Sequence, residues 1–145
     1  MMSYSEREQI VEVLNRAFYY TDYQKWEPLK NEVFTEEVML DMTSLGAPEA
    51  QLRSAQSICD EWQEGFKDLD AIHHQTGNYM ITIEGDKAKA KANGIASHYK
   101  NDALEGTTRE FVGSYDMELV NSKLGWRISA LKFNLKYMRG NLELK

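Results

Sequence analysis

The stretch KAKAKANGIASHYK, residues 87–100, decides the fold because charged or larger residues alternate with small ones along it. Lysines fill the odd positions at its start, while alanine or glycine fills the even positions from Ala88 to Ala96. Side chains of a strand point alternately to opposite faces, so this pattern predicts a β-strand with a solvated lysine face. On the same parity His98 points inward and Tyr99 outward. The inward side of small residues and histidine leaves room for a ligand, unless the helices fill it.

Three further stretches with a period of two surround this strand. Together with residues 87–100, the predicted strands cover residues 73–84, 107–120 and 125–137. The links between them are short enough for hairpins, so the sheet should be an antiparallel meander. Strands of this length exceed the usual size of about five or six residues, and a sheet built from them must twist and curl. The curl predicts a concave face.

The first part of the chain has helical patterns. Ser5 and Glu8 form a capping-box pattern, and apolar residues at helical spacing follow, which predicts a first helix over residues 5–20. A short second helix is expected over residues 26–33, with Pro28 tolerated in its first turn. The remaining predicted elements are a short strand over residues 38–42, a loop over residues 43–53 and a third helix over residues 54–67.

Composition limits the classes of function. The 145 residues are about one domain long, and we predict a single domain over residues 1–145. A net charge of -6 disfavours nucleic acid and anionic membrane surfaces as partners. The single cysteine, Cys59, excludes an internal disulfide and fits a reducing compartment. Residues 1–8 lack the apolar core of a signal peptide, and no stretch of about 18 apolar residues occurs, so we expect a cytoplasmic protein.

Two histidines are candidates for chemistry. His74 shares its predicted strand face with Thr76, Asn78 and Met80, a mostly polar set that is costly to bury without partners or a ligand. His73 should face the other way. A lone histidine more often has a structural role, but here a second one lies on the inner face of the next strand. The structural and the functional interpretation therefore stand about equal.

Asp22 lies at the C-terminal end of the first predicted helix, where the macrodipole disfavours a negative charge. Either it caps the second helix, or it accepts a hydrogen bond from an imidazole and fixes the tautomer of that ring. Tyr20 and Tyr115 are either core residues or phenols that donate to a substrate oxygen. Trp26 has mainly the character of a packing residue, and it also completes the predicted substrate-binding set. Two histidines and a carboxylate also suit an iron site, but we predict neither metal nor cofactor.

The order helix, helix, strand, helix and four long strands resembles the nuclear transport factor 2-like (NTF2-like) superfamily, in particular its SnoaL-like branch. The resemblance covers nearly the whole chain and rests on residues 20–26, 38–41, 73–78, 85–88 and 125–128. It implies an α+β fold in which a cone-shaped, curved antiparallel sheet wraps around N-terminal helices. It also implies a small ligand, polyketide-like or steroid-like, and a homodimer through the outer sheet face.

Within this superfamily the candidate acid–base residues are similar to those of the scytalone dehydratases. The matching positions are Asp22 before Trp26, His74 before Gly77, and His98 on the next strand. By this resemblance Asp22 orients His74, His74 acts as general base, and His98 acts as acid toward a departing hydroxyl. Two substrate-polarising tyrosines of those enzymes fall on Thr21 and Met42 here, and a polar asparagine falls near Tyr115.

These residues lead to two hypotheses. The first is a cofactor-independent acid–base enzyme, namely a dehydratase, isomerase or cyclase, that acts on a small, mostly apolar cyclic carbonyl compound. The alternative is a non-catalytic protein that binds a small ligand or serves as an accessory protein. The superfamily includes both kinds of protein, so the fold alone does not choose between them.

Overall fold

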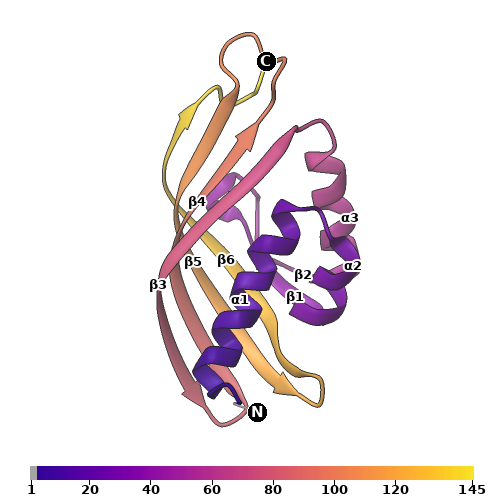
Figure 1. Ribbon diagram of the computed structural model, residues 1–145, viewed down its shortest axis with the longest axis vertical. Helices are drawn as coiled ribbons and strands as arrows, with labels where there is room; N and C mark the ends of the chain where they lie inside the picture. The colour runs from indigo at the N-terminus through magenta and orange to yellow at the C-terminus, as the bar shows by residue number, and fades with distance from the viewer. Residues whose placement is uncertain (1–2) are drawn as a thin grey trace.

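The computed structural model describes residues 3–145 and shows one curved sheet with the helices gathered on one side of it (Figure 1). The six strands lie in the spatial order β2-β1-β6-β5-β4-β3. Their bounds are β1 Phe34–Asp41, β2 Gln51–Ser54, β3 Ala71–Glu84, β4 Lys87–Tyr99, β5 Thr108–Ser122 and β6 Gly125–Gly140. The predicted α+β fold of NTF2-like type is confirmed, and the four long predicted strands are present.

The alternation along β4 is confirmed residue by residue. Its lysines are exposed, whereas Ala88, Ala90, Ala92 and Ala96 are buried beneath the helices. His98 is only 8% exposed and Tyr99 lies on the outer face. The pairs β3–β4, β4–β5 and β5–β6 are all antiparallel, as expected of a meander.

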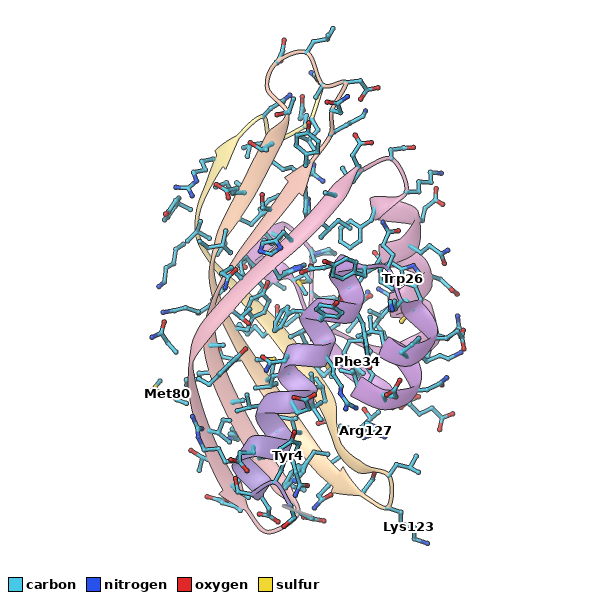
Figure 2. All side chains as sticks on the ribbon, viewed as in Figure 1. Tyr4, Trp26, Phe34, Met80, Lys123 and Arg127 are labelled. Atoms are coloured by element: carbon cyan, nitrogen blue, oxygen red, sulfur yellow. The ribbon has the colours of Figure 1, made fainter. Side chains whose placement is uncertain are left out.

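The predicted parity of β3 is correct at His74 but wrong further along the strand. The pairing register shifts between Gly77 and Met80, and Asn78 adopts a left-handed backbone with φ 58°. Such a bulge adds one residue and reverses the face of every later side chain. Met80 therefore points away from the sheet into solvent (Figure 2), and Asn78 is also exposed. Beyond the bulge the residues that pack against the core are Tyr79, Ile81 and Ile83.

The other edge of the sheet differs from the prediction. The strand expected over residues 38–42 begins earlier, at Phe34, and pairs in parallel with β6. The predicted loop over residues 43–53 contains a 3₁₀ turn, η2 (Thr43–Leu45), and the edge strand β2. β2 pairs antiparallel with β1. The sheet is therefore mostly, not wholly, antiparallel, and β2 is too short and exposed for a period of two to be visible in the sequence.

The predicted helices are confirmed with small shifts at their ends. Helix α1 (Glu6–Asp22) begins at the capping box, where the Glu8 amide donates to the Ser5 hydroxyl at 3.1 Å. The second helix consists of one α-turn, α2 (Trp26–Pro28), and a π-turn, η1 (Leu29–Val33). Helix α3 (Ala55–Phe66) is capped by Ser54. Across residues 3–145, no helix combines the length and apolar character needed to span a membrane.

Candidate active site

A cavity of about 260 Å³ lies between the sheet and the helices. Its lining is mostly aromatic and comes from α1, β1, α3, β5 and β6: Phe18, Phe34, Trp62, Phe66, Phe111 and Phe133. The polar residues that line it are Thr21, His74, His98 and Tyr115. The space expected behind β4 is therefore open only near Ala96 and His98, whereas Ala88, Ala90 and Ala92 pack in the core beneath the helices. An apolar cavity with a few polar groups is the usual form of a small-molecule site.

Two glycines make room for the rings on the sheet side of the cavity. Gly94 on β4 pairs directly with Gly113 on β5. A Cβ atom on Gly94 would lie 2.4 Å from Cε2 of Tyr115, and one on Gly113 would lie 2.8 Å from Cζ of Phe133. Both distances are too short for carbon atoms in contact. Glycine at these positions lets the two rings lie against the sheet.

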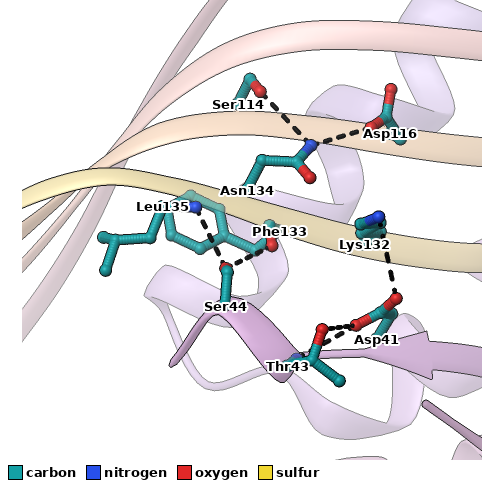
Figure 3. Close-up of polar contacts among 9 residues, drawn as sticks. All are labelled: Asp41, Thr43, Ser44, Ser114, Asp116, Lys132, Phe133, Asn134 and Leu135. Carbon is teal, nitrogen blue, oxygen red and sulfur yellow. Dashed lines mark hydrogen bonds and ion pairs between the residues drawn. The ribbon is translucent and has the colours of Figure 1, made fainter. Parts of the chain in front are cut away.

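The η2 turn is attached to β6 through Ser44, whose contacts are shown in Figure 3. The Ser44 hydroxyl donates to the Phe133 carbonyl at 2.6 Å and accepts from the Leu135 amide at 3.0 Å. The neighbouring Met42 and Leu45 both line the cavity. Ser44 thus attaches this turn to β6, and the turn brings two apolar side chains to the cavity.

Asp22, the last residue of α1, binds His74 of β3. Its Oδ1 lies 2.6 Å from His74 Nδ1, and its Oδ2 accepts from the His74 backbone amide at 3.0 Å. The two side chains are only 10% and 11% exposed. The residue before α2 is Lys25, which makes no side-chain cap. Of the two alternatives for Asp22, the structure therefore has the hydrogen bond to an imidazole, which compensates the unfavourable position at a helix C-terminus.

The contact with Asp22 determines what His74 offers to the cavity. An ionised carboxylate only accepts hydrogen bonds, so His74 Nδ1 carries the hydrogen. In the neutral ring Nε2 then holds a lone pair, and it forms no hydrogen bond with any residue among 3–145. His74 thus combines an oriented ring with a free basic nitrogen at the cavity.

His98 has a cationic partner instead. Arg109 lies directly opposite it on β5, and Arg109 Nε donates to His98 Nδ1 at 3.0 Å. The Nη1 group of the same guanidinium donates to the Leu142 carbonyl at 2.9 Å. Sequence reasoning missed Arg109, because only the register of the β4–β5 pair brings it beside His98.

The surroundings of His98 favour its neutral form. Burial, followed by the positive charge of Arg109, lowers the pKa of His98 from 6.5 to about 4. Since Nδ1 accepts from Arg109, the single hydrogen of the neutral ring lies on Nε2. This environment favours a neutral hydrogen-bond donor over the imidazolium acid inferred from the family resemblance.

Tyr115 supplies a second donor. Its ring packs against Phe18 and Phe133, with centroid distances of 4.8 and 4.9 Å, and it lines the cavity as predicted. Burial, together with the negative charge of Asp22, raises the pKa of the phenol above its usual range, so the hydroxyl keeps its hydrogen. Trp126 Nε1 is the one fully enclosed polar side-chain atom without a partner within residues 3–145. The Tyr115 hydroxyl, which makes no hydrogen bond there, is therefore accessible to a ligand.

Two predicted substrate-binding residues lie elsewhere. Tyr20 projects from a different side of α1 than Ala17 and Thr21, and its hydroxyl approaches Glu32 at 3.5 Å. Trp26 stacks on Phe66 with a centroid distance of 6.4 Å and does not reach the cavity. Neither residue lines the cavity, because the rotation of a helical residue about its axis decides which side it faces, and a part for either in substrate binding stays a prediction. The described part of the chain, residues 3–145, contains no cluster of three or more His, Cys, Asp or Glu side chains suited to a metal ion.

Comparison with known proteins agrees with this fold. Residues 2–132 match the model of the SnoaL-like domain. The Kfla4162 protein of Kribbella flavida has a similar structure, with a TM-score of 0.90 and 25% identity over 96% of this chain and 95% of that one. No protein with a curated description matches the sequence.

Several other similar structures carry the name of a reaction, among them an aromatic ring hydroxylase, a dehydratase and dehydrochlorinases. A protein of Novosphingobium aromaticivorans DSM 12444, provisionally named scytalone dehydratase, has a TM-score of 0.80 and 14% identity over 94% of this chain and 87% of that one. A hexachlorocyclohexane dehydrochlorinase of Novosphingobium barchaimii LL02 has a TM-score of 0.76 and 11% identity over 92% and 88% of the two chains. At these identities the likeness shows the fold alone.

Proposed function

The chain belongs to the SnoaL-like domain family of the NTF2-like superfamily, and from this premise we propose that it is a cofactor-independent acid–base enzyme. Its substrate is a small, mostly apolar cyclic compound with a carbonyl group, and its reaction is a dehydration, isomerisation or cyclisation. The observation that carries the proposal is the short hydrogen bond between Asp22 and His74 at the wall of an apolar cavity. A histidine fixed in this way is suited to act as a general base.

The proposed reaction begins when His74 Nε2 removes a proton from the carbon beside the carbonyl group. The electron pair of that C–H bond moves into the carbonyl, and the negative charge develops on its oxygen. Tyr115 and the neutral His98 can each donate a hydrogen bond to this oxygen. In an isomerisation His74 returns the proton to another carbon. In a dehydration the electron pair of the enolate returns to form a C=C bond, the C–O bond of the neighbouring carbon breaks, and the leaving hydroxide takes the proton from His74 as water.

The lining of the cavity supports a neutral substrate. No lysine or arginine lines it, and the carboxylate of Asp22 is engaged by His74. Two of the similar structures, a dehydratase and a dehydrochlorinase, are named for eliminations, although another is named as an aromatic ring hydroxylase. An elimination needs a base beside the hydrogen that leaves, and His74 provides one here.

Deuterium exchange tests the proposal without knowledge of the natural product. A set of cyclic ketones, such as 2-tetralone and 1-indanone, would be incubated in D₂O, and loss of the signal of the hydrogens beside the carbonyl would be followed by proton NMR. We expect the protein to accelerate exchange of at least one ketone, and His74→Gln to lower that rate about 10²–10⁴-fold. The neighbouring, exposed His73 gives the matched control, His73→Gln, which should retain the full rate.

The proposal fails if no ketone exchanges faster than in buffer, or if His74→Gln exchanges as fast as the unchanged protein. One observation favours the alternative of a ligand-binding protein without chemistry: Thr21 and Met42 line the cavity where the scytalone dehydratases are expected to have tyrosines. A ketone that raises the melting temperature of the protein but exchanges no faster than in buffer would identify that alternative.

Homodimerisation through the outer sheet face and a cytoplasmic location also belong to the proposal. Neither is needed for the chemistry, because every group named above comes from one chain. Sedimentation velocity at high protein concentration tests the dimer, and a monomer alone would count against it.

A further inference from the structure

We propose that Arg109 is a positioning residue that fixes His98 as a hydrogen-bond donor to the molecule in the cavity. The part played in catalysis rests on the proposed function. The state of the His98 ring, however, can be measured without any substrate, so the two proposals can fail separately.

The chemistry of the two side chains determines the direction of the hydrogen bond. A guanidinium group has donors only and keeps its charge at all ordinary pH values. Arg109 Nε lies 3.0 Å from His98 Nδ1, so Nδ1 must present its lone pair. The hydrogen of the neutral ring is then confined to Nε2. A histidine without such a partner exchanges between its two tautomers.

Arg109 is held in place by contacts other than His98. Its Nη1 group donates to the Leu142 carbonyl at 2.9 Å, and its guanidinium carbon lies 5.7 Å from the centroid of the Phe111 ring. The His98 ring lies between Phe66 and Phe111, with centroid distances of 5.3 and 5.6 Å. Both partners are thus fixed before a ligand arrives, which is the condition for a preorganised donor.

Charged groups reach His98 from three elements. Arg109 faces it from β5, His74 from β3 and Asp22 from α1, while α3 contributes only the uncharged Phe66. Burial, followed by the positive charge of Arg109, lowers the pKa of His98 to about 4, and the weaker effect of Asp22 acts in the opposite direction. The ring therefore stays neutral at any pH well above 4, and protonation of Nδ1 does not compete with Arg109.

This arrangement selects the ligand. A neutral His98 with hydrogen on Nε2 can serve an oxygen acceptor, such as a carbonyl, an enolate or a phenolate, but cannot accept from a ligand hydroxyl. It also makes no hydrogen bond to any residue among 3–145 except through Nδ1. A ligand with an acceptor at this end of the cavity satisfies Nε2, and a pure hydrocarbon leaves it without a partner.

Histidine NMR tests the inference directly. In protein labelled with ¹⁵N at histidine, long-range proton–nitrogen correlation spectra distinguish a nitrogen that carries hydrogen from one with a lone pair. We expect His98 to show hydrogen on Nε2 alone from pH 5 to pH 8, without titration. In Arg109→Met the ring should populate both tautomers, and its titration midpoint should rise from about 4 toward 6.5.

Arg139→Met is the matched control. Arg139 also pairs with a neighbouring strand, since its Nε lies 2.6 Å from Glu110 Oε1, and it lies 6.0 Å from the ring of Tyr137. It makes no contact with His98, so its variant should leave the His98 spectrum unchanged. The inference is overturned if Arg109→Met retains the spectrum and titration of the unchanged protein. Hydrogen on His98 Nδ1 in the unchanged protein at pH 7 overturns it as well, even if Arg109→Met does not fold.

A bound probe tests the effect on ligands. 2-Naphthol has an aromatic body for the cavity and an oxygen that can accept from His98. We expect Arg109→Met to weaken its binding about tenfold, measured by fluorescence titration, and Arg139→Met to leave it unchanged. Equal affinity in all three proteins would overturn the role of Arg109 in ligand binding. Ketone exchange that fails while the His98 tautomer is as expected would instead count against the proposed function alone.

Discussion

The two histidine ends of the cavity place the same side chain in opposite surroundings. At the α1–β3 end a carboxylate accepts from Nδ1 of His74, whereas at the β4–β5 end a guanidinium donates to Nδ1 of His98. Both rings leave Nε2 for the cavity. In the neutral rings, however, this nitrogen has a lone pair at His74 and a hydrogen at His98. The charge behind an imidazole thus decides whether its free nitrogen takes a proton or donates a hydrogen bond.

The largest effect is expected when the hydrogen bond between Asp22 and His74 is removed. Asp22→Asn keeps the shape of the side chain but lets an amide hydrogen face Nδ1, which moves the ring hydrogen to Nε2 and removes the base. We expect the rate of ketone exchange to fall about 10²–10⁴-fold. Asp116→Asn is the control, because Asp116 lies on the outer face beside Lys91. Full activity in Asp22→Asn would show that the two ends do not differ in the way described.

The next effect concerns the His98 end and the pH dependence of stability. The pKa of His98 is 6.5 in the unfolded chain and about 4 in the folded protein. Between these values the unfolded chain binds a proton that the folded protein does not, so stability falls as the pH decreases. The loss from this group is about 3 kcal/mol, complete at about pH 4.

Urea unfolding of the unchanged protein and of His98→Gln between pH 7 and pH 4 measures this effect. Carboxylates contribute to the slope in both proteins, so only the difference between the two curves reports on His98. The free energy of unfolding should depend less steeply on pH in the variant. Parallel curves would mean that the pKa of His98 is the same in the folded protein and in the unfolded chain, and the contrast with His74 would be lost.

A smaller effect is expected from a change that moves Tyr115, which forms no hydrogen bond with His74 or His98. Gly94→Ala places a Cβ atom 2.4 Å from the Tyr115 ring, so the ring must shift, and we expect a loss of about 1–3 kcal/mol in stability. Gly65→Ala in α3 has no atom within 4 Å of the new Cβ and should stabilise the protein by up to about 1 kcal/mol. Thermal unfolding compares the two. Unchanged stability in Gly94→Ala would show that the ring has space to move.

Local patterns in the sequence were sufficient to predict much of the fold. The alternation along β4 identified its buried face and the inward direction of His98, and the capping box located the start of α1. The bulge in β3 was missed, although glycine followed by asparagine within a strand is a usual sign of one. β2 has only four residues and lies at the edge of the sheet, so burial leaves no pattern in it.

The candidate site was harder to predict because it depends on contacts between distant elements. The bond between Asp22 and His74 joins residues of α1 and β3, and the sequence left it as one of two alternatives. Arg109 meets His98 only in the register of the β4–β5 hairpin. Tyr20 packs against the core but away from the cavity, and this likewise follows from the packing of the whole helix α1 and not from its own neighbours in the sequence.

The opposite charges behind the two histidines also have a stereochemical consequence. An apolar cavity screens a carboxylate and a guanidinium weakly, so a carbonyl dipole inside it is held with its oxygen toward the positive end. The aromatic walls of the cavity restrict the rotation of its ring about this direction. In the proposed reaction the same one of two mirror-related hydrogens would then face His74 in every turnover. Asp22 and Arg109, each behind one histidine, would thus help to set the stereochemistry of proton removal.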